Sequence, residues 1–479
     1  RKITYLVIFA TLIAVYVISA SATEFHLSEG LASFPKAMAW IGHNLMPDEK
    51  AMERFPKILD KLIETALLSV AVTVIAAIFA FCFSLFGSKA TGFNGIVNRI
   101  VRIVAAFFRN VPDVVWAMLL MFSFGQNILT GFFALFFTTF GLLTRAFIET
   151  IDEVSAAGIE ALNASGANFI QTVFQAIIPS AMPGIVTWIL YMIETNIRNS
   201  TLIGILTATG IGYLFDLYYK RLDFSSASLV VVSIIVLVIA IELVSNLIRK
   251  VILDQTTPVL TQYSGVCNAR RKRSGKIKIG VHSKSNSAVK ILITVLLGLT
   301  VYAFISFDYK EIVLGEAIAA TLRNVKTVFL EPKLSTDTFK NVMYQLFLTF
   351  CLGTLSTIFG AIAAFFCSLL CAKNTAPSGV ANAVKCVIAL IRAVPTVLWV
   401  LIFAVSAGLG SVAAVIGLTF HSFAYLTKVY AESIEEIDDG TIEALRASGA
   451  GFWQIVFQAI VPASLSRMVA WTFMRFEIN

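Results

Sequence analysis

Long apolar runs limit most strongly what this chain can fold into. Residues 66–86 carry no charged side chain, and a helix of about 20 apolar residues is long enough to cross a bilayer. Comparable runs recur at 3–22, 185–206, 229–247, 291–307, 346–370, 387–407 and 411–426. Residues 103–148 contain two more, separated by a Gly-Gln-Asn turn, and a further run begins at Met468. The sequence therefore predicts an all-α polytopic membrane protein with ten complete spans and the start of another.

The composition excludes most other classes of protein. Hydrophobic residues make up 58% of the chain and charged residues 14%, whereas about a quarter of a soluble domain is charged. A disordered chain, a secreted disulfide scaffold and almost any soluble enzyme are thereby excluded. Cys367 and Cys371 share a helical face, but no His or further Cys lies nearby in the sequence. We expect them to be small core residues and expect no metal site.

The basic excess of the chain is concentrated in one segment. Residues 249–290 hold ten Lys or Arg and one acid, Asp254, so this segment is +9 in a chain of net charge +8. Apolar runs flank it, which favours a cytoplasmic linker that follows the positive-inside rule. A nucleic-acid site is disfavoured because no aromatic side chains interleave with the basic ones. Six spans before the linker place the N-terminus in the cytoplasm as well.

The two halves of the chain repeat each other at an offset of 283 residues. Residues 160–179 and 443–462 are identical at 15 of 20 positions. Arg-Asn-Val-Pro at 109–112 faces Arg-Ala-Val-Pro at 392–395. We therefore expect one transmembrane domain at 1–250, a linker at 251–287 and a second domain at 288–479. The chain begins without Met and stops inside an apolar stretch, so we expect both ends to be incomplete.

The best-matched stretch is a loop between two spans, present once in each half. Acidic residues precede each copy, where they suit the N-terminus of a helix. Small residues follow, and then an apolar stripe at helical spacing. Such a helix can pack on its own bundle, or it can dock onto a soluble partner on the cytoplasmic side.

At these loops the sequence resembles the permease subunits of ABC importers. Their signature is Glu-Ala-Ala, three residues, Gly, and then Ile-x-Leu-Pro. The matching residues and their small neighbours are Glu160, Ala161, Gly166, Ala167 and Pro179 in the first copy and Glu443, Ala444, Gly449, Ala450 and Pro462 in the second. The third position is Leu162 or Leu445, a mild departure.

A narrower resemblance, to the phosphonate-uptake permease family, covers most of the second half. It rests on residues 392–395, 432–438, 443–450 and 476–479 together with Trp399 and His421. The first half matches less fully, since Asn110 replaces Ala and Thr138 stands at the place of His421. The resemblance implies a tandem fusion of two type I ABC importer transmembrane domains. These would be parallel repeats of six spans each, the second repeat being incomplete in this sequence.

The resemblance also implies a function and a set of partners. The chain would pass phosphonate, or a related phosphorus oxyanion such as phosphite or phosphate, across a bacterial plasma (inner) membrane. An extracellular or periplasmic phosphonate-binding protein would deliver the anion, and two ABC ATPase subunits would use ATP and Mg²⁺. Each loop would dock into one ATPase, so we expect one copy of the chain per transporter. The chain has no Gly-rich phosphate loop, so we expect no ATP hydrolysis and no cofactor in it.

Ionisable residues within the spans are candidates for the substrate pathway, because burying them in a bilayer is costly. Arg109 and Arg392 are equivalent in the repeat, and guanidinium groups suit an oxyanion. Both lie near the expected cytoplasmic end of a span, where snorkelling to the interface is the competing interpretation. Glu194 and Arg198 are four residues apart and are expected to form an ion pair on one helix face. The remaining candidates are Asn196, Ser200, Thr201, Trp116, Trp399, His421, Glu477 and Asn479, among which packing is the alternative role of the two Trp and the His.

Two other functions remain open on the sequence alone. The loop signature also fits an ABC importer of another small solute, such as methionine or an osmoprotectant. An ion-coupled secondary transporter with six plus six spans in parallel repeats fits the span count, but it does not explain the duplicated loop. A membrane enzyme is disfavoured because no nucleophile–base arrangement or metal-ligand cluster is present.

Overall fold

The computed structural model is helical throughout the part of the chain that it describes, with no strand there. The described residues are 2–44, 47–91, 94–154, 156–253, 284–307, 309, 312–333, 337–408 and 410–479. Most of the expected linker at 251–287 therefore lies outside the described residues. In the described part, eight helices are long and apolar enough to cross a membrane, or up to 11 spans exist if each bent pair counts as one. This is the polytopic all-α architecture that the sequence predicts.

The helices follow the same order in each half. The first half contains α1 (Lys2–Ala22), α2 (Leu27–Asn44), α3 (Glu49–Glu53), α4 (Phe55–Gly87), α5 (Gly95–Asn110), α6 (Asp113–Phe124), α7 (Ile128–Val154), α8 (Ala156–Ala164), α9 (Phe169–Thr172), η1 (Val173–Ile177), α10 (Ile178–Thr207), α11 (Gly210–Lys220) and α12 (Phe224–Leu253). The second half contains α14 (Lys284–Ser306), α15 (Leu314–Leu330), α16 (Phe339–Cys371), α17 (Ser378–Ala393), α18 (Thr396–Ala407), α19 (Ser411–Glu435), α20 (Asp439–Ala447), α21 (Phe452–Ile455), η3 (Val456–Ile460) and α22 (Val461–Ile478).

The duplication in the sequence is reproduced in the helix bounds. α17, α18, α20, α21 and η3 begin and end 283 residues after α5, α6, α8, α9 and η1. The same kinds of residue end the elements in both copies. Gly125 and Gly408 terminate α6 and α18 with φ of 70° and 79°, a conformation that side chains with a Cβ rarely adopt. The repeated sequence therefore produces a repeated backbone.

Two apolar runs that the sequence predicts as straight spans are broken at a proline. α5 and α6 meet at 85°, and so do α17 and α18. Val111 and Val394, which precede Pro112 and Pro395, have extended backbones with ψ of 118° and 123°, because a following proline ring disfavours the helical conformation. The expected span at 387–407 is therefore not one straight helix. It consists of the end of α17, a bend and α18.

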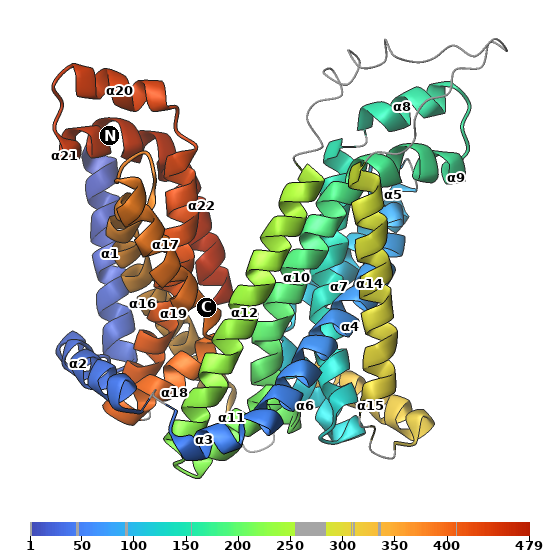
Figure 1. Ribbon diagram of the computed structural model, residues 1–479, viewed down its shortest axis with the longest axis horizontal. Helices are drawn as coiled ribbons and strands as arrows, with labels where there is room; N and C mark the ends of the chain where they lie inside the picture. Colours follow the sequence, from blue (N-terminus) through green and yellow to red (C-terminus); the bar gives the residue numbers. More distant parts are fainter. Residues whose placement is uncertain are drawn as a thin grey trace. The chain divides into compact units, whose positions relative to one another are not determined.

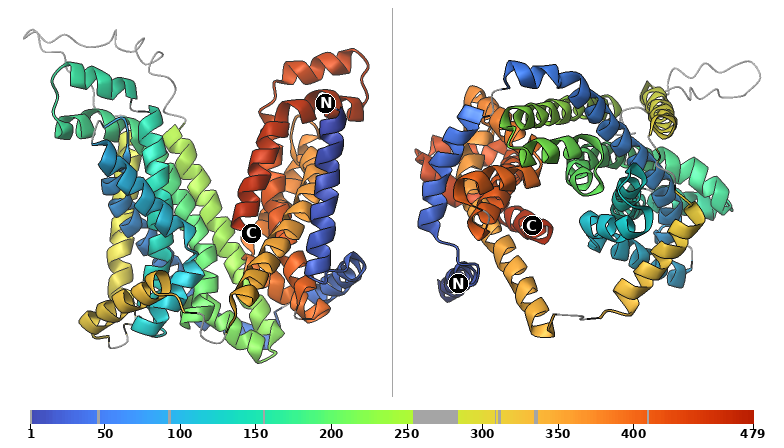
Figure 2. Two further views of the ribbon diagram at one scale, coloured as in Figure 1. Left: turned by 180° about the vertical axis from the view of Figure 1, so that it is seen from behind. Right: turned by 90° about the horizontal axis from the view of Figure 1, so that it is seen from below.

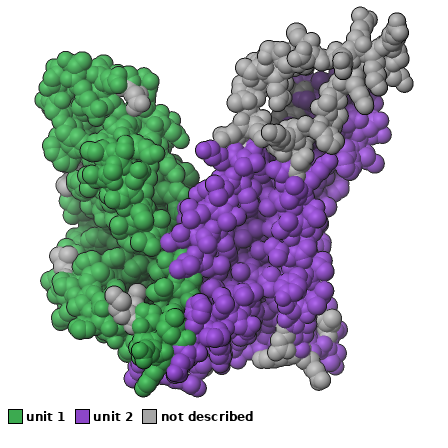
Figure 3. Space-filling model, viewed as in Figure 1, with its two compact units in different colours: residues 1–52, 224–235, 332–479 green, residues 53–223, 236–331 purple. Residues whose placement is uncertain are grey.

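The described helices group into two compact units, which Figure 3 colours separately. Unit 1 comprises Arg1–Met52, Phe224–Ile235 and Pro332–Asn479, and unit 2 comprises Glu53–Asp223 and Val236–Glu331. This grouping differs from the segments 1–250, 251–287 and 288–479 that the sequence suggests, because each unit takes helices from both halves.

The exchanged elements are the first helices of each half. In unit 1, Tyr16 of α1 meets Phe359 of α16 edge to face, with ring centroids 5.9 Å apart. The blue α1 runs beside the orange α16 in Figures 1 and 2. In unit 2, α14 packs along α4 and α15 packs on α6, where Asn324 Nδ2 donates a hydrogen bond to Ser123 Oγ at 3.0 Å. Each unit is therefore completed by helices from the other half of the sequence.

One helix lies at the centre of each unit. α7 contacts α4, α5, α6 and α10, and its equivalent α19 contacts α16, α17, α18 and α22. At Gly141, α7 approaches α5 so closely that a Cβ there would lie 2.6 Å from the backbone nitrogen of Arg109. Glycine at this position therefore sets how deeply the end of α5 packs against the central helix.

Candidate functional site

The matched loops form a short helical pair at one end of each unit. In unit 2, α8 and α9 lie at the opposite end from α6 and α11, and in unit 1, α20 and α21 lie at the opposite end from α2 and α18 (Figure 1). One face of each first helix is anchored in the core, since Ile159 and Ile442 are 3% and 2% exposed. The exposed residues of the signature are Glu160, Ala161, Gly166 and Pro179 in the first copy and Glu443, Ala444, Gly449 and Pro462 in the second. The signature face is therefore open to contact.

A glycine in the left-handed region ends both of these helices. Gly166 has a φ of 80° and Gly449 a φ of 83°. The next amide, that of Ala167, donates to the carbonyl of Leu162 at 3.0 Å, which is the pattern of a Schellman cap. Nothing lies within 4 Å of a Cβ built on either glycine. The backbone conformation, and not a lack of space, therefore requires glycine here.

A five-residue π-helix joins each loop to the following span. η1 and η3 have the same sequence, Val-Phe-Gln-Ala-Ile. At the end of η1, Ile178 donates its N–H to the carbonyl of Val173, five residues earlier. Pro179 and Pro462 come next and have no N–H for a regular helical bond, which favours the wider turn. The two signature prolines therefore mark a joint between loop and span.

Arg109 and Arg392 lie at the ends of α5 and α17, directly before the bends. α5 begins at Gly95, so Arg109 is about 21 Å along the axis from the start of its helix at a rise of about 1.5 Å per residue. Arg392 is 8% exposed, and Arg109 is partly buried. Both arginines are therefore far along their helices, next to the bends, and the expected position near the inner end of a span stays a prediction.

A buried amide lies at the centre of unit 2. Asn196 of α10 is 1% exposed. Its Nδ2 donates to Thr73 Oγ1 on α4 at 2.9 Å and to Thr139 Oγ1 on α7 at 3.0 Å. An amide between hydroxyl groups of neighbouring helices stabilises their packing in an apolar surrounding. Asn196 therefore ties three helices together.

Unit 1 contains the equivalent arrangement. Asn479, the residue 283 positions after Asn196, donates from Nδ2 to Thr357 Oγ1 on α16 and to Ser422 Oγ on α19, both at 2.9 Å. Ser422 is the equivalent of Thr139 in the repeat. The two asparagines were expected in the substrate pathway, and the structure places each in an interhelical hydrogen-bond cluster, with Asn196 buried and Asn479 partly buried.

Three charged residues lie in or near these clusters. Arg198 Nη1 is 2.8 Å from Glu194 Oε1, which confirms the expected ion pair. Arg475, 4% exposed, donates from Nε to Ser422 Oγ at 3.0 Å and lies over the ring of Tyr425. Arg475 was not among the residues expected at the site. Its spacing of four residues before Asn479 was the signal that both share a helix face.

The remaining candidates fall into packed and more open groups. Trp116 packs on Phe137 with ring centroids 4.7 Å apart, and Trp399 donates from Nε1 to the Ile391 carbonyl at 3.1 Å. The two tryptophans therefore pack within their units. Ser200 is buried, with its Oγ 3.4 Å from Ser69 Oγ, and Thr201 is fully buried. His421 is partly buried and Glu477 is exposed.

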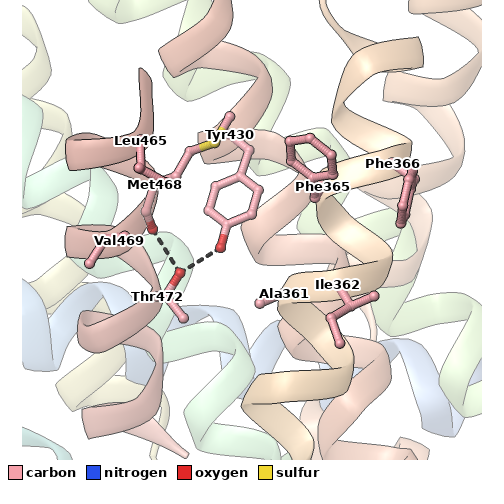
Figure 4. Close-up of a pocket in the computed structure, with 9 residues that line it drawn as sticks. All are labelled: Ala361, Ile362, Phe365, Phe366, Tyr430, Leu465, Met468, Val469 and Thr472. Atoms are coloured by element: carbon pink, nitrogen blue, oxygen red, sulfur yellow. Dashed lines mark hydrogen bonds between the residues drawn. The ribbon is translucent and has the colours of Figure 1, made fainter. Parts of the chain in front are cut away.

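A pocket of about 330 Å³ opens between α16, α19 and α22 (Figure 4). Its lining residues are Ala361, Ile362, Phe365, Phe366, Tyr430, Leu465, Met468, Val469 and Thr472. The hydroxyl groups of Tyr430 and Thr472 are 2.5 Å apart and form a hydrogen bond with each other. This apolar lining offers no charged partner to an anion. Within the described ranges, no group of three or more His, Cys, Asp or Glu is placed to hold a metal ion.

The chain is similar to known transport proteins in both of its halves. The family model described as "Binding-protein-dependent transport system inner membrane component" matches residues 83–256 and 364–479. The phosphate-import permease protein PhnE of Mycolicibacterium smegmatis is 26% identical over 421 residues, which cover 87% of this chain and 74% of that protein. The phosphite transport system permease protein PtxC of Stutzerimonas stutzeri is 26% identical over 220 residues, which cover 46% of this chain and 79% of that protein.

A solved structure of the MetNI methionine ABC transporter in inward-facing conformations aligns with a TM-score of 0.35 and 21% identity, covering 38% of this chain and 92% of that chain. The family model falls once in each half of the repeat, and its two matches together cover more than half of the sequence. The chain therefore belongs to the family of binding-protein-dependent transport system inner membrane components and carries two units of it in tandem.

Proposed function

We propose that this chain is the permease subunit of an ATP-driven ABC importer for a phosphorus oxyanion such as phosphonate, phosphite or phosphate. Membership of the transport family supports the class of protein. Relatives described as phosphate-import and phosphite transport permeases support the class of substrate. The chain itself is a transport subunit and not an enzyme.

The duplicated loop is the observation that carries this proposal. Each copy packs one face on its own unit, exposes Glu160 or Glu443 on the other face, and continues through a π-helix into a span. An exposed, rigidly capped helix of small residues suits close docking in a groove of a soluble partner. Two loops then engage two ATPase subunits, which bind ATP and Mg²⁺, and one copy of the chain serves one transporter.

This assignment fixes the orientation of the chain in a bacterial plasma (inner) membrane. The loops contact the ATPases in the cytoplasm, and the N-terminus and the basic linker lie on the same side. α2 and α15, each at the end of its unit opposite the loops (Figure 1), are then the elements that face the extracellular or periplasmic binding protein.

The two bent helices supply the basic residues that suit an anion. Arg109 and Arg392 each lie at a bend between two half-length helices, and Arg offers paired donors to oxyanions. We assign this pair to the substrate pathway. The ion pair of Glu194 with Arg198, and the amides of Asn196 and Asn479, support the helices around it.

The test is ATP hydrolysis by the reconstituted complex. The chain is placed in proteoliposomes with its ATPase and binding protein, and phosphonate, phosphite, phosphate, methionine and glycine betaine are compared. We expect at least one phosphorus oxyanion to stimulate hydrolysis and to be taken up, and the two organic solutes to do neither. Stimulation by methionine or glycine betaine alone would overturn the substrate class. Uptake driven by an ion gradient without an ATPase would overturn the importer class.

A further inference from the structure

An acid at the end of α7 holds the turn between α4 and α5. Asp152 Oδ1 accepts hydrogen bonds from Ser88 Oγ at 2.5 Å, from the backbone N–H of Lys89 at 2.9 Å and from that of Ala90 at 3.2 Å. Its other oxygen, Oδ2, accepts from Arg102 Nη2 at 3.0 Å. One carboxylate therefore binds both the backbone of the turn and a side chain of α5.

The second half contains the equivalent contact with different residues. Glu435 Oε1 accepts from the backbone N–H of Lys373 at 2.9 Å and from Lys385 Nζ at 2.7 Å. Glu435 and Lys385 are the equivalents of Asp152 and Arg102 in the repeat. The contact is therefore retained although both the acid and the base differ. We refer to Asp152 and Glu435 as the anchor acids.

The anchor acids connect two parts of the proposed machinery. Asp152 lies in the last turn of α7, and α8 of the docking loop begins at Ala156. The turn that it binds leads into α5, which carries Arg109 at its other end. Arg102 also donates from Nε to the carbonyl of Gly87 at 3.1 Å. The end of α7 next to the docking loop is thereby hydrogen-bonded to the start of the bent helix.

The charge pairing alone does not explain this arrangement. The side chains of Arg102 and Asp152 are 39% and 27% exposed, and those of Lys385 and Glu435 are 36% and 28% exposed. Partly exposed ion pairs contribute little to stability. Hydrogen bonds from the backbone to a charged acceptor are stronger and directional, and they fix the path of the turn relative to α7 and α19.

We infer that Asp152 and Glu435 are positioning residues that couple the ATPase-docking loops to the bent helices α5–α6 and α17–α18. This inference rests on the proposed function. Without the anchor acids, closure of the ATPases would still move the loops, but the start of α5 or α17 would follow less completely.

The test compares three double variants with the wild-type complex. Asp152→Asn with Glu435→Gln removes both charges at nearly constant shape. Asp152→Glu with Glu435→Asp exchanges the two acids between the halves and keeps both charges. Glu149→Gln with Glu432→Gln is the matched control, because these acids lie one turn earlier on the same helices and pair along them with Arg145 and Lys428.

The deciding measurement is the number of oxyanion molecules imported per ATP hydrolysed. We expect the neutral variant to lower this ratio by about fivefold, the lower end of coupling between distant sites, and the other two variants to keep it. Amide hydrogen exchange of the purified chain in nanodiscs is the second measurement. We expect faster exchange at residues 88–91 in the neutral variant only.

The outcomes separate this inference from the proposed function. An unchanged transport ratio in the neutral variant, or an equal loss in the control variant, would overturn the coupling role. If the wild-type complex imports no oxyanion, the proposed function fails and the coupling role fails with it. Hydrogen exchange then still shows whether the anchor acids hold the turn, and unchanged exchange in the neutral variant refutes that contact.

Discussion

Asn196 occupies in unit 2 the position that Asn479 occupies in unit 1, and each donates hydrogen bonds to hydroxyl groups of two neighbouring helices. The hydroxyl groups differ between the units, but the amide is the same. The repeat therefore retains an amide donor in each helix bundle, buried in unit 2 and partly buried in unit 1.

Replacing Asn196 by Ala should lower the free energy of unfolding by about 0.5–1.5 kcal/mol. Thr73 can still donate to its own helix, to the Ser69 carbonyl at 2.7 Å, which limits the loss. Unfolding in mixed detergent micelles measures it. Asn341→Ala, at an exposed amide near the start of α16, is the control and should change stability much less. Equal losses in the two variants would contradict a stabilising role of the buried cluster.

Replacing Gly141 by Ala should displace the end of α5. The added Cβ would lie 2.6 Å from the Arg109 backbone nitrogen, and overpacking of this kind costs about 1–3 kcal/mol. We expect a lower melting temperature and reduced oxyanion uptake. Gly298→Ala in α14, where a Cβ meets nothing within 4 Å, should leave both unchanged. Wild-type stability of Gly141→Ala would show that α5 is not held closely by α7.

Deleting Gln175 should convert η1 into regular α-helix and leave the chain folded. A π-helical turn holds one residue more than an α-helical turn, so removing one exposed residue restores regular geometry on both sides. Deleting Thr187 inside α10 is the control, because it rotates all later residues of that helix by about 100°. Size-exclusion profiles and thermal melts compare the two deletions. If both deletions misfold equally, the π-helical turn does not arise from one extra residue inserted into a regular α-helix.

Replacing Gly166 and Gly449 by Trp should impair ATP-driven uptake while the chain still inserts. Both glycines have positive φ, which costs about 1–2 kcal/mol for other residues, and a large side chain would block docking of the loop. Copurification of the ATPase and stimulated hydrolysis should both fall. Gly379→Trp, at another open position outside the loops, should retain both. Normal stimulation in the loop variant would count against docking.

Replacing both Arg109 and Arg392 by Ala should reduce oxyanion uptake by about tenfold, which corresponds to about 1.4 kcal/mol. The amount of assembled complex should be retained. Arg475→Met provides a comparison, because Met192 is the natural residue at the equivalent position. We expect this variant to lose stability, through the lost hydrogen bond to Ser422, more than it loses uptake. Normal uptake in the double variant would remove the arginine pair from the pathway.

The all-helical membrane fold and its duplication were predictable from the sequence because both depend on local composition. Apolar runs such as 66–86 must become helices in a bilayer, where no water can satisfy the backbone. The bend at Pro112 was not predicted, because the hydropathy remains high on both sides of the proline. Only the backbone restriction that Pro112 places on Val111 indicates the bend.

The interior of the site was less accessible to sequence reasoning. The ion pair of Glu194 and Arg198 was predictable because it lies within one turn of one helix. The hydrogen bonds of Asn196 to Thr73 and Thr139 join residues 123 and 57 positions apart, and no local pattern specifies them. The exchange of α1 and α14 between the units was not predicted for the same reason. In a repeated sequence, α1 could pack on α4 of its own half or on the equivalent α16 of the other half, and the sequence does not indicate which.

That exchange has a consequence for the order in which the protein is made. α1 and α2 are synthesised before α16, on which α1 packs, because α16 begins at Phe339, about 300 residues later. At about 5–20 residues per second, α1 waits some tens of seconds for its partner. An apolar helix tolerates this delay because its backbone hydrogen bonds are all internal and lipid can cover its sides. By contrast, all residues assigned to unit 2 have been synthesised by residue 331, so the described helices of unit 2 should assemble before those of unit 1.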